Sequence, residues 1–490
     1  MRSLLTTRRV FVTILALGLF VMAVRGISDP DFWWHLRTGE LIVKTHSFLR
    51  TDPYSFTRFG QRWVNHEWLS DVLIFSVYRT SGFAGLMVTF AAIIAATFLL
   101  VYRRCPGRPY LAAFLTLWGA EAATLSWGAR PQMFTLLLAA TFLLIIDRSD
   151  ERPAILWWTV PLSLLWVNLH AGYALGIGLL ALALIGAGLD AAFGSRQYPH
   201  SAENRRALTL AFIASLTVVS LNPNGMRLYS YPLETLRSRA MQTYINEWFS
   251  PDFHQARYVL LLGMILATLV MLTISPRRLS CREILFLSAA LFAALRSVRH
   301  IPVFVLIAVP VLCKLTEGCI ERYGSAWLLT PKPRPGTWRT AVLNAVILAA
   351  FGTFTFARIR YVEHQQPEIE AERFPARAVQ FICSQHPTAP MLNHYSWGGY
   401  FIWKLYPNYR VFIDGRADLY GDSFMNNFAA SYYLTGEWRR LLQTWGIRSI
   451  VLPPDAPLVT ALESEPGWTR VYADSQVTVL TEVTDSRRNH

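Results

Sequence analysis

Long apolar runs recur along most of this chain, and they constrain its fold more than any other feature of the sequence. A helix needs roughly 20 mostly apolar residues to cross a bilayer, and it satisfies its own backbone hydrogen bonds within the hydrocarbon. Hydrophobic residues make up 53% of the 490 positions and charged residues only 16%, a composition too apolar for an ordinary soluble domain. The sequence therefore predicts a polytopic α-helical membrane protein.

About eleven runs are long enough to be interpreted as transmembrane spans. They cover residues 10–27, 82–102, 109–127, 131–147, 153–169, 171–191, 207–221, 257–275, 283–298, 300–317 and 339–357. The first run is interpreted as a retained helix and not as a signal peptide, because no small-residue cleavage site precedes Asp29. Residues 67–80 are ambiguous between a twelfth span, a re-entrant helix and an interfacial helix. A full span is rejected there, because it would move the basic cluster at Arg103 to the outside.

Basic residues occupy every second connection between the spans, and this alternation predicts the sidedness of the chain. The clusters are Arg2, Arg8 and Arg9; Arg103, Arg104 and Arg108; Arg148 and Arg152; Arg196, Arg205 and Arg206; Arg277, Arg278 and Arg282; and Lys332, Arg334 and Arg339. The positive-inside rule places these loops and the N-terminus in the cytoplasm of an inner (plasma) membrane, so an odd number of spans leaves the chain outside from Tyr361 onward. The net charge of +14 therefore reflects topology, and nucleic acid is not an expected partner.

The chain divides into a membrane part and a globular part. Residues 1–357 hold the spans and an external loop at 28–81, whose unusual length marks it as functional. Residues 361–485 lack long apolar runs and alternate short strand-like and helical patterns, which predicts a periplasmic or extracellular α/β domain. Strands are expected at 390–393, 410–413 and 449–452, with a hairpin through 471–480.

The external loop begins with an amphipathic pattern at residues 31–45. Its apolar stripe consists of Phe32, Leu36, Gly39 and Val43. Its charged stripe consists of Arg37, Glu40 and Lys44. This pattern predicts a helix lying in the membrane interface, a depth that suits Trp33 and Trp34. The runs on either side of residues 59–60 predict a short hairpin further along the loop.

Two carboxylates, Asp29 and Asp31, flank Pro30 where the first helix leaves the membrane, and His35 follows them. Two close carboxylates can bind a divalent cation such as Mg²⁺ or Mn²⁺, or one of them can act as a general base while the other tunes it. The alternative is a solvated turn in which Asp31 caps the next helix. The motif alone favours the cap.

The predicted topology brings further polar residues to the same membrane face. They are His66, Glu67, Arg130, Asn168, His170, Asn222, Asn224, Glu247, Asp252, Arg296, Arg299 and His300. Each is a weak signal alone, since Arg130 and Arg299 could pair with headgroup phosphates and residues 222–225 are typical of a turn. Their convergence nevertheless favours an active site at this face. Glu121, inside the third span, is expected to be paired, with Arg130 as a candidate partner.

Polar and aromatic side chains also gather in the C-terminal domain. Asp414, Gly415 and Arg416 follow the expected strand at 410–413, a position where open α/β sheets bind ligands, although a simple turn is the favoured interpretation. Residues 393–400 (NHYSWGGY) add aromatic rings and two glycines. These rings could stack on a sugar or dock the domain onto the membrane part.

These features together resemble the GT-C glycosyltransferases, such as the protein O-mannosyltransferases and the lipid A aminoarabinose transferases. The resemblance rests on the basic first helix, the acidic motif at its external end, the amphipathic helix, the His66-Glu67 motif before the next helix and the external α/β domain. The chain is also similar to uncharacterised bacterial membrane proteins that carry DxDFWWHL, WGGY and VFIDGR segments.

The resemblance implies transfer of a sugar from a polyprenyl-phosphate-linked donor, held among membrane lipids, to an acceptor outside the cytoplasm. Asp29 or Asp31 would match the catalytic acid of the first loop. His66-Glu67 would stand where the family has His-Pro-Pro or Lys-Pro-Pro, with Glu67-Trp68 replacing the two prolines. The remaining candidates, for binding substrate or the leaving phosphate, are His35, Arg130, His170, Arg296, Arg299 and His300. A divalent cation at Asp29 and Asp31 remains an alternative.

Two other functions stay open on the sequence. A lipid or sugar transporter or flippase would be expected to show inverted repeats, broken helices and charges near the bilayer midplane, and the sequence shows little of these. A non-catalytic assembly protein would bind a partner through its external domain, and its acidic loop would be only a helix cap.

Overall fold

The computed structural model describes residues 7–193, 201–324 and 337–483. The chain falls into two compact units. The helical unit comprises Met1–Arg25, Ala84–Tyr229 and Asn246–Glu363; the mixed unit comprises Gly26–Phe83, Ser230–Ile245 and His364–His490. Each unit is therefore assembled from segments that are far apart in the sequence. The predicted domain boundary near residue 360 lies within one helix, α15 (Trp338–Arg373).

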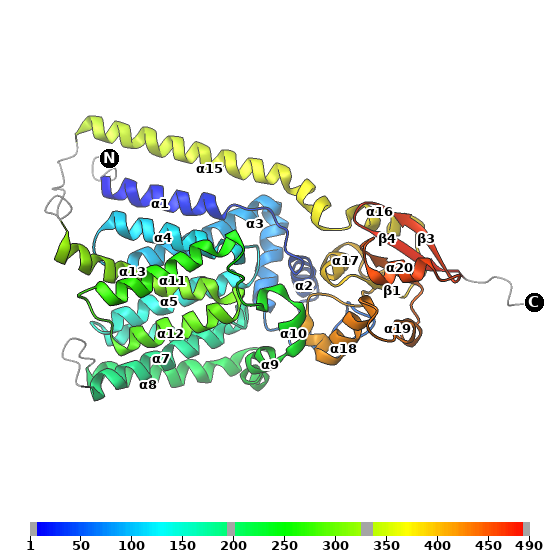
Figure 1. The fold of residues 1–490 in the computed structure, drawn as a ribbon, viewed down its shortest axis with the longest axis horizontal. Helices are drawn as coiled ribbons and strands as arrows, with labels where there is room; N and C mark the ends of the chain where they lie inside the picture. The colour runs from blue at the N-terminus through cyan, green and yellow to red at the C-terminus, as the bar shows by residue number, and fades with distance from the viewer. Residues whose placement is uncertain (1–6, 194–200, 325–336, 484–490) are drawn as a thin grey trace, which may run out of the picture. The chain divides into compact units, whose positions relative to one another are not determined.

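The helical unit is built mostly of closely packed helices, and its part of α15 is largely exposed (Figure 1). It contains α1 (Thr7–Ala23), α4 (Pro109–Ala123), α5 (Gln132–Ser149), α6 (Thr159–Leu169), α7 (Tyr173–Ala192), α8 (Ala202–Thr217), α11 (Val259–Ile274), α12 (Cys281–Arg296), α13 (Ile301–Tyr323) and parts of α3 (Trp68–Arg104) and α15. Helix α13 packs against α4, α11 and α12, and α12 packs against α7. Small residues allow this closeness, since a Cβ atom at Gly119 of α4 would lie 2.5 Å from Val309 of α13.

Six of the described helices are long and apolar enough to cross a membrane. They are Trp68–Arg104, Gln132–Ser149, Tyr173–Ala192, Ala256–Ile274, Val298–Tyr323 and Trp338–Arg373, and a shorter apolar helix covers Pro153–Leu169. Helices cover most of every predicted span. The prediction of a multi-pass helical membrane protein is confirmed. The number of about eleven spans stays a prediction.

Helix α3 is divided by a kink at Gly82. This glycine has φ 60° and ψ −155°, a conformation that is essentially restricted to glycine. Residues up to Phe83 belong to the mixed unit, and residues from Ala84 belong to the helical unit. The kink therefore separates the ambiguous segment at 67–80 from the predicted span at 82–102.

The mixed unit contains a four-stranded sheet in the order β1-β2-β4-β3. Its strands are β1 (Met391–Asn393), β2 (Ser449–Leu452), β3 (Trp468–Ala473) and β4 (Thr478–Glu482), with β1 and β2 parallel and the other pairs antiparallel. Its helices are α2 (Phe32–Thr45), α9 (Tyr231–Arg237), α10 (Arg239–Tyr244), α16 (Ala376–Gln385), α17 (Gly398–Leu405), α18 (Ala417–Tyr432), α19 (Trp438–Thr444) and α20 (Pro457–Glu463). The strands expected near 390–393 and 449–452 and the terminal hairpin are confirmed.

The strand expected at 410–413 is wrong. Only Val411 makes a bridge, and its partner is Ser55 in the external loop, not a strand of the sheet. The Val411 amide donates to the carbonyl of Tyr54 at 3.0 Å, and the Phe56 amide donates to the carbonyl of Val411 at 3.1 Å. The segment reads as a strand because it is apolar and extended, but its backbone groups are paired with the loop.

The helix predicted at 31–45 is present as α2, but its tryptophans do not face lipid. Trp33 is fully buried and Trp34 is 7% exposed. The ring of Trp33 packs edge-on against Phe374 and Tyr400, at centroid distances of 5.4 and 5.1 Å. These aromatic contacts with the C-terminal segment take the place of the expected membrane interface.

Candidate functional site

Asp29 and Asp31 lie in the turn that leads into α2. The Asp31 amide donates to Oδ1 of Asp29 at 2.8 Å, so Asp29 stabilises the turn. Asp31 occupies the N-cap position, yet its side chain accepts no capping hydrogen bond from the helix. Its Oδ1 instead accepts a hydrogen bond from the indole Nε1 of Trp34 at 3.2 Å. The helix-cap interpretation is therefore wrong for the Asp31 side chain.

Two glycines of the C-terminal segment bring its backbone against this acidic turn. A Cβ atom at Gly415 would lie 1.7 Å from Oδ1 of Asp31. A Cβ atom at Gly399 would lie 2.4 Å from the carbonyl oxygen of Pro30. Both separations are shorter than real Cβ contacts, so only glycine permits this approach. The glycines of the WGG and DGR motifs thus hold two distant segments in direct contact.

His35 on α2 is held between the carboxylates of Glu67 and Asp71. Its Nδ1 lies 2.6 Å from Oδ1 of Asp71, and its Nε2 lies 3.4 Å from Oε2 of Glu67. All three side chains are buried. Burial alone would lower the pKa of His35, but the hydrogen bond and charge of Asp71, with smaller contributions from Glu67 and Asp31, raise it above its usual value. The surroundings of His35 therefore favour the imidazolium.

His66 extends this chain on the other side of Glu67. Its Nε2 lies 3.2 Å from Oε1 of Glu67, and its ring lies 4.5 Å from that of Tyr231. Burial would lower the pKa of His66, but the charge of Glu67 and its hydrogen bond raise it. Asp418 is hydrogen-bonded to Tyr231. Burial raises the pKa of Asp418 above its usual value, and the charge of His66 partly offsets that rise. The chain from Asp71 to Asp418 thus alternates acidic and basic groups.

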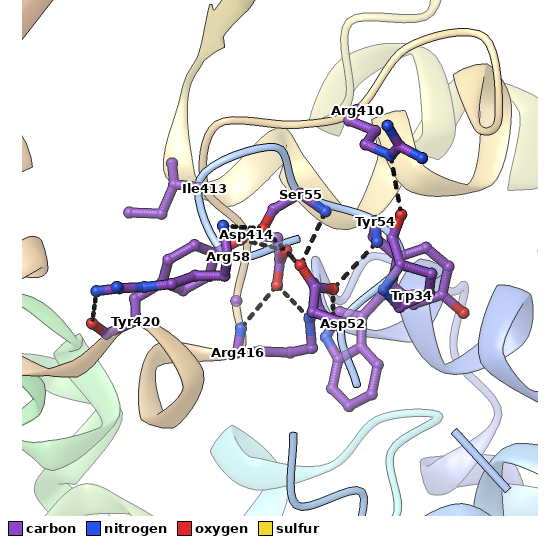
Figure 2. A network of polar contacts seen from close by, with 12 residues as sticks. Trp34, Asp52, Tyr54, Ser55, Arg58, Arg410, Ile413, Asp414, Arg416 and Tyr420 are labelled. Carbon is purple, nitrogen blue, oxygen red and sulfur yellow. Dashed lines mark hydrogen bonds and ion pairs between the residues drawn. The ribbon is translucent and has the colours of Figure 1, made fainter. Parts of the chain in front are cut away.

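A second buried network surrounds Arg416 (Figure 2). Its guanidinium lies 2.8 Å from Oδ1 of Asp52 and 2.7 Å from Oδ2 of Asp414, and all three side chains are almost completely buried. It also stacks over Trp63, 4.6 Å from the ring centroid. Burial would lower the pKa of Arg416, but the two carboxylates hold it well above its usual value. The Tyr420 hydroxyl donates to Asp414 at 2.7 Å. The DGR motif therefore forms a charge cluster with Asp52 of the segment between α2 and α3.

Other predicted residues gather within the helical unit around Glu247 and Trp248. Arg130 forms an ion pair with Glu247, and the guanidinium of Arg299 lies 5.5 Å from the ring centroid of Trp248. The ring of His300 packs edge-on against Trp248 at 6.2 Å. Burial would raise the pKa of Glu247, but Arg130 and Arg299 lower it below its usual value. Arg130, Arg299 and His300 thus share one cluster.

The last two predicted residues have mainly structural contacts among those described. Nδ1 of His170 lies 2.8 Å from the Thr135 hydroxyl and accepts the Gly172 amide at 3.0 Å. Arg296 ends α12, and its carbonyl accepts a hydrogen bond from Ser250 at 3.4 Å.

Arg130 forms an ion pair elsewhere, and its expected pairing with Glu121 stays a prediction. It pairs with Glu247, and the charge of Glu121 acts on Arg25, whose Nη1 also donates to the carbonyl of Thr124 at 2.8 Å.

The structure therefore divides the predicted site residues into two sets. Asp29, Asp31, His35, His66 and Glu67 belong to the mixed unit, and the remaining predicted site residues, Arg130, His170, Arg296, Arg299 and His300, belong to the helical unit.

Sequence reasoning missed several members of the site. Asp71 lies four residues after Glu67, a spacing that puts both side chains on one helix face and could have indicated it. The segment 230–245 reads as an ordinary connection between spans, and nothing in it signals that Tyr231 reaches His66. Asp418 lies two residues after Arg416 of the DGR motif, but its partner is set by tertiary structure.

The residues described include no group of three or more His, Cys, Asp or Glu side chains that could hold a metal ion. Asp29 accepts the Asp31 amide, and Asp31 accepts the Trp34 indole, so both carboxylates already have protein donors. These observations give no support to the cation alternative.

Comparison with known proteins gives similarity at the level of structure alone. No protein-family model and no curated protein sequence matches the chain. Oligosaccharyltransferase AglB from Archaeoglobus fulgidus, solved with an inhibitory peptide and a dolichol-phosphate, matches 90% of this chain and 69% of its own at 10% identity and a TM-score of 0.55. The same archaeon's enzyme tethered to an acceptor peptide matches 98% of this chain and 75% of its own at 11% identity and a TM-score of 0.55.

The chain has a GT-C-like fold. ArnT from Cupriavidus metallidurans bound to undecaprenyl phosphate is a weaker match, at 14% identity and a TM-score of 0.47, over 97% of this chain and 98% of its own. The two matches with a TM-score of 0.55 confirm the predicted resemblance in fold, over 90% and 98% of this chain.

Proposed function

We propose that this protein is a glycosyltransferase that moves a sugar from a polyprenyl-phosphate-linked donor to an acceptor on the external face of the membrane. The observation that carries the proposal is the acidic turn at Asp29 and Asp31. Within a GT-C-like fold, this turn stands beside a buried chain of alternating acidic and basic groups. The solved structures of similar fold contain dolichol-phosphate or an acceptor peptide, which supports a lipid-linked donor.

The proposed reaction needs a base for the acceptor and a stabilised leaving group. Asp31 or Asp29 removes the proton from an acceptor hydroxyl, whose oxygen then forms a bond to the anomeric carbon of the sugar. The bond between that carbon and the phosphate oxygen breaks, and polyprenyl phosphate departs with the electron pair. Glu67 lies between two histidines whose raised pKa values favour their protonated forms.

Arginines that the sequence predicts on the external membrane face are proposed to stabilise the leaving phosphate. The candidates are Arg299, which we rank first, Arg296 and Arg130. Their guanidinium groups can bind phosphate through paired, charge-assisted hydrogen bonds. Arg130 is already paired with Glu247, so it would contribute less positive charge than Arg299. His170, whose Nδ1 contacts are structural, is the weakest of the predicted substrate-binding residues.

A direct assay tests the proposal. Purified protein is incubated with radiolabelled polyprenyl-phosphate sugars and candidate acceptors, and wild type is compared with Asp29→Asn, Asp31→Asn and Glu67→Gln. We expect transfer by wild type and a loss of about 10²-fold or more for the variant that removes the base. Glu437→Gln is the matched control, because this carboxylate is exposed and forms a surface ion pair with Arg440. Undiminished transfer by all three site variants would sink the catalytic assignment. Absence of transfer by wild type with every donor would favour a transporter or an assembly protein.

A further inference from the structure

The Asp31 carboxylate is enclosed by residues from two segments that lie far apart in the sequence. On one side, Trp34 of α2 donates to its Oδ1 at 3.2 Å. On the other side lies the backbone of Gly415, so close that a Cβ atom there would stand 1.7 Å from the same oxygen. The position of this oxygen therefore depends on the DGR loop as much as on its own helix.

The DGR loop is itself held in place by buried ionic contacts (Figure 2). The Arg416 side chain is clamped by Asp414 and Asp52, and Asp52 is in turn hydrogen-bonded to the amides of Tyr54 and Ser55 at 3.1 and 3.0 Å. A buried guanidinium paired with two carboxylates is strongly held in position. Moving it away from either partner would leave an uncompensated buried charge. The loop is therefore a rigid support.

A second path of contacts leads from Arg416 to Asp31. The guanidinium lies over the ring of Trp63 at 4.6 Å, and Trp63 packs edge-on against Trp34 at 5.8 Å. Trp34 is the residue that donates to Asp31. The DGR loop thus touches Asp31 directly through Gly415 and supports its hydrogen-bond donor through Trp63.

We propose that the Asp414-Gly415-Arg416 loop sets the position of the Asp31 carboxylate, with Gly415 and Arg416 acting as positioning residues for the proposed transfer. The inference rests on the proposed function for its catalytic consequence. The C-terminal segment is then a structural part of the acidic site. A methyl group at position 415 forces the Asp31 oxygen or the loop to move by about 1 Å or more, and misplacement on this scale costs about 10²-fold in rate.

Gly415→Ala tests the inference, with Gly467→Ala as the matched control. Gly467 belongs to the same unit, and a Cβ atom there meets nothing within 4 Å. The first readout needs no activity: purified protein is labelled with a water-soluble carbodiimide and a small amine, and the rate at Asp31 is followed by peptide mass spectrometry. We expect a severalfold change in that rate for Gly415→Ala and none for Gly467→Ala. Equal rates in wild type and both variants would overturn the inference.

The second readout is the kinetics of sugar transfer, with the thermal unfolding midpoint measured beside it. For Gly415→Ala we expect kcat to fall about 10²-fold while KM for the donor stays within about twofold, because the substrate still binds. In an Asp31→Asn background the same change is expected to cost no further activity, since its effect passes through Asp31. A parallel loss in both backgrounds, or full activity of Gly415→Ala, would refute the positioning role.

The two readouts separate the failure of this inference from failure of the proposed function. If wild type transfers no sugar, the function falls, and the labelling of Asp31 still decides whether Gly415 positions it. Arg416→Lys covers the case in which Gly415→Ala does not fold. It retains the charge and loses the paired geometry of the guanidinium, so we expect altered labelling of Asp31 and a lower kcat; unchanged labelling and kcat would count against the inference.

Discussion

Individual side chains of the mixed unit are tuned by partners from distant segments. His35 is the clearest case, because a fully enclosed imidazole would ordinarily lose its proton, and Asp71 reverses that tendency. The spacing of Asp71 from Glu67 hints at a shared helix face, but only the fold shows that Asp71 lies 2.6 Å from His35. The sequence indicated which residue types near α2 are candidates for a functional site, but it could not indicate which of them are in contact.

The raised pKa of His35 predicts a dependence of stability on pH. A folded-state pKa above the unfolded value of about 6.5 contributes stability that is complete below that pH and is lost as the pH rises through the folded-state pKa. We therefore expect the unfolding midpoint of the detergent-solubilised protein to fall as the pH rises above about 6.5, and His35→Gln to flatten that decline. A decline of the same slope in His35→Gln would contradict the assignment.

His394 supplies the matching test of the opposite sign. Burial lowers its pKa to about 4, so its contribution is present above the unfolded value of about 6.5 and is lost as the pH falls toward 4. We expect His394→Gln to retain more stability than wild type between about pH 6 and 4, measured by the same unfolding scan. An unchanged acid limb would show that the folded protein does not hold this histidine neutral.

At the scale of elements, packing depends on glycines at helix crossings. A Cβ atom at Gly39 of α2 would lie 2.0 Å from the backbone oxygen of Asp71 on α3, and a backbone atom cannot rotate away. Gly178 of α7 is also within a helix, but a Cβ atom there meets nothing within 4 Å. We expect Gly39→Ala to destabilise by about 1–3 kcal/mol and Gly178→Ala to be neutral or stabilising. Equal unfolding midpoints for the two variants would contradict the crossing geometry.

Helices and most strands were predictable because their signals are local. The run at 449–452 is β-branched and apolar and forms β2 as expected, whereas 410–413 has a similar composition and pairs with a loop more than 350 residues earlier. The predicted location of Trp33 at the membrane interface was wrong for the same reason. Its amphiphilic ring suits a membrane interface by composition, but Phe374 and Tyr400 bury it. Local patterns fix the type of element; partners distant in sequence decide what it faces.

For the whole molecule, the predicted sidedness is open to a chemical test. Cys383 is exposed, and the sequence places it outside, whereas Cys105 lies beside a basic connection predicted to be cytoplasmic. We expect a membrane-impermeant maleimide to label Cys383 in intact cells and to label Cys105 only after permeabilisation. Cys383→Ser is the control for the external signal. Labelling of Cys383 that requires permeabilisation would reverse the topology and remove the support for an external active site.

The contact between Gly415 and Asp31 also has a consequence in time. The two residues are separated by about 380 positions, and ribosomes add about 5–20 residues per second. Asp31 is therefore made roughly 20 to 80 seconds before the backbone that encloses it exists. Throughout that interval the membrane segments can be inserted while the acidic turn lacks its contact with the backbone of Gly415. If Gly415 positions Asp31 as proposed, a chain truncated before position 415 is expected to transfer no sugar.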